Sequence, residues 1–259
     1  MKLRLWQVDA FTNRRMSGNP AAVVPLEAWL PDETLLAIAA ENNLSETAYL
    51  VNDGGAWRIR WFTPATEVPL CGHATLASAH VLFTHLAPGL ASVTFASASG
   101  PLTVTRDGSR LVLDFPAYVP ERVHTPRLRV YALGAEPLET WVGRKMMAVF
   151  ATEADVRALA PDFRLVARIE AQGVIATAPG GDCDFVSRYF VPQMGIDEDP
   201  VTGSAHCLLT PYWANRLGRA KLHARQVSRR GGELWCESRG ERVAIAGEAV
   251  DYLAGTIEV

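Results

Sequence analysis

The stretch of sequence that decides the fold covers residues 59–83 and reads IRWFTPATEVPLCGHATLASAHVLF. Residues 187–213 read SRYFVPQMGIDEDPVTGSAHCLLTPYW and repeat the same order of features. Both copies begin with Arg, an aromatic residue, Phe, a variable residue and Pro. Both then place a Glu five positions before a Gly that opens a run of small and apolar residues. Self-similarity of this kind predicts two copies of one supersecondary unit.

The pattern around the two copies predicts a strand-rich chain with one buried helix at the centre of each half. Alternating or β-branched runs predict strands at 3–11, 48–51, 57–62, 92–95, 102–106, 110–115, 128–133, 146–150, 174–177, 185–190, 223–228, 233–237 and 242–246. Apolar residues at helical spacing predict helices at 31–40, 74–86, 152–160 and 204–217. The predicted fold class is therefore α+β, with two pseudo-symmetric β-rich halves that each wrap around a central helix.

A cluster of prolines marks the predicted boundary between the halves. Pro116, Pro120 and Pro126 lie close together, where a composition of this kind is typical of a connection. Residues 1–116 form the expected N-terminal half, with 250–259 as a candidate addition to it, and residues 117–249 form the C-terminal half. Pseudo-twofold duplication places equivalent loops face to face, so we expect the active site in a cleft between the halves.

Length and composition describe an ordinary globular protein. The 259 residues are 49% hydrophobic and 20% charged, with a net charge of −3 and no concentrated basic face, so nucleic acid is not an expected partner. No stretch approaches the roughly 18 apolar residues of a membrane helix. The N-terminal residues lack the apolar core of a signal peptide, and the four cysteines show no CxxC spacing. We therefore expect free thiols in a cytoplasmic protein that binds no membrane.

The familiar cofactor and hydrolase motifs are missing from the sequence. It contains no GxGxxG, no GxxxxGK[ST], no HExxH and no GxSxG. These absences argue against nucleotide cofactors, catalytic zinc and a hydrolase nucleophile elbow. We expect no cofactor and no metal, so that any chemistry depends on side chains alone.

The glycines that open the two predicted central helices are candidates for an anion site. Gly72 and Gly203 each follow a proline-containing loop, and a helix start presents unpaired N–H groups and a partial positive charge. Two such ends facing one cleft would bind a carboxylate without a lysine or arginine. The alternative is that these glycines only permit tight packing of helix against strand.

Three residues near these helix starts are candidate acids and bases. Glu46 precedes a hydrophobic strand, where burial of a carboxylate costs several kcal/mol unless it is paired or protonated. Such a group suits general acid–base catalysis, although a capping role is the alternative. His73 and Asp199 have alternatives as a core histidine and a turn former. Cys71 precedes a helix start, where we expect an acidified thiol, with a buried apolar role as its alternative.

These residues resemble the phenazine-biosynthesis isomerase family, the PhzF-like proteins, which share their fold with diaminopimelate epimerase. The resemblance rests on five sequence segments that span most of the chain: QVDAFT, GNPAAVV, NNLSETAYL, RWFTPATEVPLCGHATLA and MGIDEDPVTGSAHCLL. It implies a cofactor-independent isomerase, a homodimer, and a small carboxylated substrate. By position, it implies that Glu46 is the proton-shuttling acid/base and that His73 and Asp199 are its polar partners. The substrate contacts that it implies are Ser45, Gly72, Gly203 and Ser204.

The resemblance to the epimerase branch is incomplete at one position. Those enzymes use two cysteines on opposite faces of the substrate. Cys71 matches the first, but Thr202 stands at the second, and a hydroxyl is a far weaker acid than a thiol. This favours proton removal and return by one carboxylate. A cysteine-dependent epimerase or racemase, and a non-catalytic binding module for a small molecule or protein, stay as alternatives.

Overall fold

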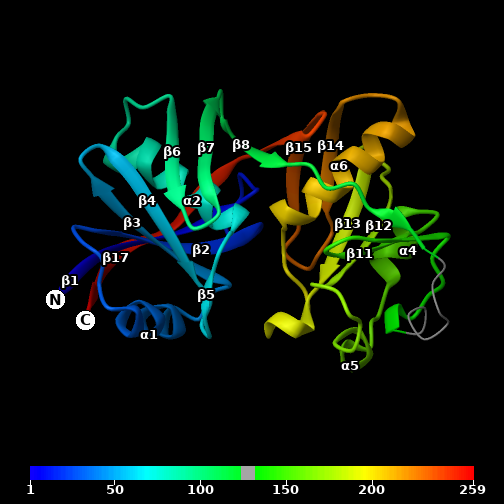
Figure 1. Ribbon diagram of the computed structural model, residues 1–259, viewed down its shortest axis with the longest axis horizontal. Coiled ribbons are helices and arrows are strands. Elements are labelled where there is room, and N and C mark those ends of the chain that lie inside the picture. Colours follow the sequence, from blue (N-terminus) through cyan, green and yellow to red (C-terminus); the bar gives the residue numbers. More distant parts are fainter. Residues whose placement is uncertain (124–131) are drawn as a thin grey trace. The chain divides into compact units, whose positions relative to one another are not determined.

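The computed structural model describes residues 1–123 and 132–259 of the chain, which form two compact units. The first unit comprises Met1–Phe115 and Ile245–Val259, and the second comprises Pro116–Ala244. In the first unit the N-terminal strand β1 and the C-terminal strand β17 pair antiparallel, so both termini belong to it (Figure 1).

The first unit is built mainly from strands. Its strands are β1 (Lys2–Ala10), β2 (Asn19–Leu26), β3 (Glu46–Asp53), β4 (Ala56–Phe62), β5 (Glu67–Val68), β6 (Ser92–Ser97), β7 (Gly100–Asp107), β8 (Arg110–Pro116) and β17 (Ala249–Glu258). Successive partners in the order β1, β2, β3, β4, β6 and β7 alternate between antiparallel and parallel pairing.

The second unit repeats this pattern with its own strands. They are β9 (Glu121–Arg122), β10 (Glu139–Val142), β11 (Met146–Val149), β12 (Val174–Pro179), β13 (Phe185–Phe190), β14 (Lys221–Gln226), β15 (Gly232–Arg239) and β16 (Arg242–Gly247), the last of which ends in the first unit. Partners in the order β10 to β15 again alternate between antiparallel and parallel pairing. The two units therefore share one topology, as the sequence repeat predicts.

Helices are few, which confirms the α+β class. They are α1 (Asp32–Asn42), α2 (Gly72–Val81), which continues as a π-helical turn at Leu82–Leu86, α4 (Glu153–Ala158), α5 (Phe163–Val166) and α6 (Gly203–Leu217), with a 3-10 turn at Pro192–Met194. In the first unit α2 is almost entirely buried and packs on β1, β2, β3 and β17. In the second unit α6 packs on β14 and β15. Among the described residues, no helix is both long and apolar enough to cross a membrane.

Apart from the two-residue strands β5 and β9, which were not expected, the predicted strands differ from the observed ones at four places. Strands β2, β10 and β17 were not expected, and β2 contains two prolines, which ordinarily count against a strand. The strand predicted at 128–133 lies mostly outside the described residues, and the two residues of it that the structure describes are helical.

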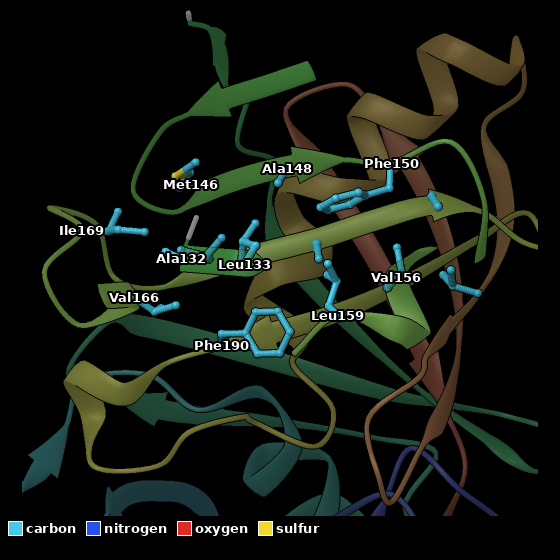
Figure 2. Close-up of a cluster of buried hydrophobic side chains, with 14 residues drawn as sticks. Ala132, Leu133, Met146, Ala148, Phe150, Val156, Leu159, Val166, Ile169 and Phe190 are labelled. Atoms are coloured by element: carbon cyan, nitrogen blue, oxygen red, sulfur yellow. The ribbon is translucent and has the colours of Figure 1, made fainter. Parts of the chain in front are cut away.

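Each sheet has two apolar faces, one toward the central helix and one toward the smaller helices. In the second unit the outer face is a cluster that joins β11, β12 and β13 to α4 and α5. Figure 2 shows Met146, Ala148 and Phe190 in this cluster together with Val156 and Leu159. Because side chains alternate along a strand, the residues between these point toward α6.

Equivalent ion pairs stabilise the loop before each central helix. The Arg60 guanidinium donates to both carboxylate oxygens of Glu67 at 2.7 and 2.6 Å, and Arg188 does the same to Glu198 at 2.8 Å. Both glutamates therefore accept hydrogen bonds from an arginine side chain. They neutralise the arginine of their own repeat, a bidentate arrangement that fixes the loop geometry.

A tight turn leads into β2. Gly18 has φ +64°, and a Cβ on it would stand 2.2 Å from the carbonyl oxygen of Ala10. Only glycine fits this close approach of one backbone to another. The turn fixes the position of Asn19, the first residue of β2, which is fully buried.

Replacement of Gly18 by Ala should lower the free energy of unfolding by about 3 kcal/mol or more, because the backbone strain and the clash add. Gly54 is the matched control: its φ is +61°, but nothing lies within 4 Å of a Cβ placed there. Gly54→Ala should cost only about 1 kcal/mol. Urea unfolding of both variants measures the difference, and equal losses would show that the close approach is unimportant.

Candidate active site

Glu46 occupies the first position of β3, directly after the end of α1. Helix α1 stops because Asn43 adopts the left-handed conformation, with φ 48°. Tyr49 on β3 belongs to the core that packs on α1. Side chains alternate between the two faces of a strand, and Glu46 lies three residues before Tyr49. Glu46 therefore points to the other face of the sheet, toward α2. The side chain of Glu46 is 14% exposed. Its carboxylate is therefore held largely away from bulk water.

His73 is the direct partner of this carboxylate. Its Nε2 lies 3.1 Å from Oε2 of Glu46, and its side chain is 6% exposed. The second residue of α2 thus meets the first residue of β3. Neither Oε2 of Glu46 nor Nε2 of His73 makes a well-aligned hydrogen bond to a described residue. Both atoms keep hydrogen-bonding capacity that a ligand could use.

The other imidazole nitrogen of His73 faces Asn19 and Cys71. Nδ1 lies 3.2 Å from Nδ2 of Asn19 and 3.5 Å from Sγ of Cys71. The amide oxygen of Asn19 in turn accepts a long hydrogen bond, 3.5 Å, from the hydroxyl of Ser45. With the amide donating to Nδ1, a neutral imidazole carries its proton on Nε2, which faces Glu46. Asn19 therefore orients the ring toward the carboxylate.

The electrostatics of this cluster favour a charged His73. Burial lowers the pKa of the imidazole, but Cys71 and Glu46 outweigh burial and hold that pKa well above its usual value. Burial, with a smaller contribution from the Glu46 carboxylate, raises the pKa of the Cys71 thiol to about 11. The thiol is then neutral near neutral pH, so the carboxylate is the anion that stabilises the imidazolium.

The expectation of an acidified Cys71 was therefore wrong. The residue does occupy the position just before α2, but its side chain is buried and forms no capping hydrogen bond. Desolvation raises the pKa of a thiol, and here it outweighs the favourable field of the helix end and of His73.

Glu46, Cys71 and His73 also form the one group among the described residues with spacing that could suit a metal ion. Their ligand atoms lie within 4.8 Å of one another. Glu46 and Cys71, however, contact opposite nitrogens of the imidazole, and an ion binds only one nitrogen of a histidine. This arrangement suits a hydrogen-bonded relay better than a metal centre.

A second polar network lies at the start of α6 in the second unit. The hydroxyl of Thr202 donates to Oδ2 of Asp199 at 2.5 Å. The buried amide of Gln226 donates to the carbonyl oxygen of Asp199 at 2.7 Å and accepts from the backbone N–H of Thr202 at 2.8 Å. The network fixes Asp199 four residues before the helix start at Gly203.

The starts of α2 and α6 are built alike. Thr75 donates its hydroxyl to the carbonyl oxygen of Cys71, and His206, at the same helical position, donates Nδ1–H to the carbonyl oxygen of Thr202. Burial lowers the pKa of His206 to about 4, so this ring is neutral. Neither Cys71 nor Thr202 caps its helix through a side chain. The first N–H groups of both helices therefore receive no hydrogen bond from the residue that usually satisfies them.

The predicted site residues fall into two groups, one in each unit. Glu46, His73, Gly72 and, through Asn19, Ser45 come together in the first unit. The second unit contributes Asp199, together with Gly203, which is buried, and Ser204, which is half-buried. The expectation that the groups face one cleft stays a prediction.

Sequence reasoning did not single out two of these polar residues. Asn19 lies within the GNPAAVV segment, whose Gly-Asn-Pro turn signal could have identified it. Gln226 carried no such signal, because its role depends on strand β14 lying beside the loop that contains Asp199.

Known proteins resemble this chain over its whole length. A sequence profile of the family described as phenazine biosynthesis-like protein (PhzC-PhzF) matches residues 8–255. An uncharacterized isomerase of Pseudomonas aeruginosa is 55% identical over 261 residues, covering 100% of both chains.

Solved structures extend the likeness from sequence to fold. A PhzF-family protein of Enterococcus faecalis superposes with a TM-score of 0.98 at 45% identity and 100% coverage of both chains. A hydroxyproline epimerase of Agrobacterium vitis, with bound trans-4-hydroxy-L-proline, shares the fold at a TM-score of 0.62 and 13% identity, covering 99% of this chain and 92% of that one. The predicted epimerase-like α+β fold is confirmed. The names of its relatives support an isomerase activity for the family as a whole. The chain belongs to this family, the phenazine biosynthesis-like proteins.

Proposed function

We propose that this protein is a cofactor-independent isomerase that moves a proton on a small carboxylated amino or hydroxy acid, with Glu46 as the general acid–base. The observation that carries the proposal is the buried contact of 3.1 Å between the Glu46 carboxylate and His73. A carboxylate with little exposure, a single charged partner and unused hydrogen-bonding capacity is suited to taking up and returning a proton.

The proposed step conserves atoms and electrons. The Glu46 carboxylate removes a proton from an activated carbon, and the electron pair of that C–H bond moves into the adjacent unsaturated system. The carboxylic acid so formed delivers a proton to a second carbon, either the one it removed or, after exchange with water, one from solvent. This shifts the double bond and regenerates the carboxylate. Nothing is oxidised or reduced overall. His73 holds the carboxylate in place, and Asn19 holds His73.

The substrate carboxylate would be bound at the helix starts. The uncapped N–H groups after Cys71 and Thr202 are donors for an anion, and the fields of the two helices favour negative charge there. Asp199 would bind a donor group of the substrate, such as an amine or hydroxyl.

Glu46→Gln should reduce proton exchange between substrate and solvent by about 10²- to 10⁴-fold, because the amide keeps the shape of the side chain but is not a base. The assay is incorporation of deuterium from heavy water into a panel of carboxylated metabolites, followed by NMR. Glu67→Gln is the control, because that carboxylate pairs with Arg60 outside the cluster and should leave exchange intact. Undiminished exchange in Glu46→Gln would remove Glu46 from the mechanism, and ligand binding without exchange in the wild type would indicate a binding protein.

The raised pKa of His73 predicts a pH-dependent contribution to stability. Because the pKa is higher in the folded protein than in the unfolded chain, the charged imidazole stabilises the fold fully below about pH 6.5. That contribution is lost as the pH rises through the folded pKa. The difference in unfolding free energy between wild type and His73→Gln should therefore decrease from about pH 6 upward. Urea unfolding at a series of pH values measures this difference.

The same comparison in a Glu46→Gln background provides the control. Without the carboxylate the anion that raises the pKa is gone, so the pH dependence of the difference should become much weaker. A pH dependence that is the same in both backgrounds would show that the Glu46 carboxylate does not hold the charge on His73.

A cysteine-dependent epimerase is the second candidate, because Cys71 lies 3.5 Å from the imidazole of His73. The pKa of about 11 for the thiol and the threonine at the equivalent position of the other repeat count against it. Cys71→Ser should therefore keep exchange within about tenfold of wild type, because serine preserves the packing and the small polar group. Loss of exchange in Cys71→Ser with normal exchange in Glu46→Gln would support the thiol mechanism instead.

A further inference from the structure

Lys145 is a buried cation in the second unit that none of the steps above uses. Its residue exposure is 8%, and its ammonium lies 5.6 Å from the centre of the Tyr189 ring. No carboxylate among the described residues forms an ion pair with it. Burial lowers the pKa of its ammonium, although Cys207 and Asp199 oppose this through their charge. A buried ammonium with no counter-ion is costly to the fold.

The strand register shows which residue of the first unit Lys145 corresponds to. In the repeat motif Phe190 matches Phe62, and these residues pair with Val174 and Thr47 respectively. Val174 pairs in turn with Met146, and Thr47 with Ala22. Lys145, one residue before Met146, therefore corresponds to Ala21, one residue before Ala22.

Ala21 is the residue that pairs directly with Glu46 in the parallel ladder of β2 and β3. In the second unit the residue that corresponds to Glu46 is Gly173, whose carbonyl oxygen accepts from the N–H of Met146 at 3.1 Å. At this position of the sheet the first unit has the carboxylate of Glu46. The second unit has Gly173 there, and the ammonium of Lys145 belongs to the residue just before β11.

The direction of the Lys145 side chain follows from its neighbour. Met146 points into the outer core with α4 and α5 (Figure 2). Because side chains alternate along an extended chain, the side chain of Lys145, the residue before it, points to the opposite face, toward α6. Two contacts confirm that this face meets α6: Trp213 of that helix donates to the hydroxyl of Thr177 at 3.0 Å and stacks on Phe185. In the first unit the equivalent face bears the cluster of Glu46 and His73.

Lys145 lies next to the network at the start of α6. The ammonium of Lys145 lies over the ring of Tyr189. The backbone carbonyl oxygen of Tyr189 accepts from the N–H of Asp199 at 3.0 Å. The turn before Lys145 packs at Gly143 against Leu208 of α6. The buried cation and the uncapped start of α6 are therefore on one face of one unit.

We propose that Lys145 is a positioning residue that binds the carboxylate of the substrate as its counter-ion in the second unit, together with the N–H groups at the start of α6. The proposal rests on the proposed function for its substrate class. A bound carboxylate would neutralise the buried ammonium of the second unit. Lys145 would then select for anionic over neutral ligands.

The test compares the wild type with Lys145→Met, which keeps length and removes charge, Lys145→Gln as a second uncharged variant, and Lys145→Arg, which keeps charge. The probes are acetate, benzoate and trans-4-hydroxy-L-proline, with benzamide as the neutral counterpart of benzoate. Melting temperature and calorimetric titration of the full chain are the readouts. Circular dichroism identifies the variants that fold.

Lys145→Met and Lys145→Gln should bind a carboxylate roughly tenfold to a hundredfold more weakly than the wild type, and Lys145→Arg within a few-fold of it. Benzamide should not distinguish the proteins. Without ligand, the uncharged variants should melt above the wild type, because the unpaired buried charge is gone. The proposal is overturned if no carboxylate of the panel raises the melting temperature of the wild type more than that of the uncharged variants.

Glu46→Gln separates this proposal from the proposed function. If Glu46→Gln loses exchange but keeps carboxylate binding, while the uncharged Lys145 variants lose binding, both proposals are supported. Loss of binding in the Lys145 variants with normal exchange in Glu46→Gln would sustain the role of Lys145 and reject Glu46 as the base. Loss of exchange in Glu46→Gln with unchanged binding in the Lys145 variants would do the reverse.

Discussion

The contact between Glu46 and His73 is the constraint on which the rest of the first unit depends. Both side chains are mostly buried, and the Glu46 carboxylate is one of the groups that hold the pKa of His73 above its usual value. The contact forms only if the first residues of β3 and of α2 lie next to each other. The left-handed Asn43, the Gly18 turn and the loop held by Arg60 and Glu67 secure these points.

Duplication explains how one scaffold carries different chemistry in its two units. The strand pairings and the loop ion pairs are the same in both, so the backbone positions available to side chains are the same. At these positions the residues differ in kind: Cys71 corresponds to Thr202, His73 to Ser204, and Glu46 to Gly173. The contact between a glutamate and a histidine is thus confined to the first unit, which agrees with the proposed mechanism that uses one carboxylate more than with one that uses a matched pair.

The sequence was sufficient for the features that depend on local pattern. The repeated motif predicted the shared topology, and the glycines predicted the starts of α2 and α6 within one or two residues. Strand β2 was missed because Pro20 and Pro25 mask its pattern, although tertiary pairing with β1 and β3 forms it. The pKa direction at Cys71 was missed for a different reason: a helix start can be read from sequence, but the depth of burial that opposes it cannot.

The polar groups that the fold leaves without a full set of partners argue for a ligand. Oε2 of Glu46 and Nε2 of His73 in the first unit, and the ammonium of Lys145 in the second, are buried at a cost that apolar residues of similar size would avoid. One such group could reflect an accident of packing. Glu46, however, begins β3, and Lys145 directly precedes β11 at the position that corresponds to Ala21, the residue that pairs with Glu46 in the first unit. In each unit a ligand could supply the missing partner: a donor or an acidic C–H for the carboxylate of Glu46, and an anion for the ammonium of Lys145.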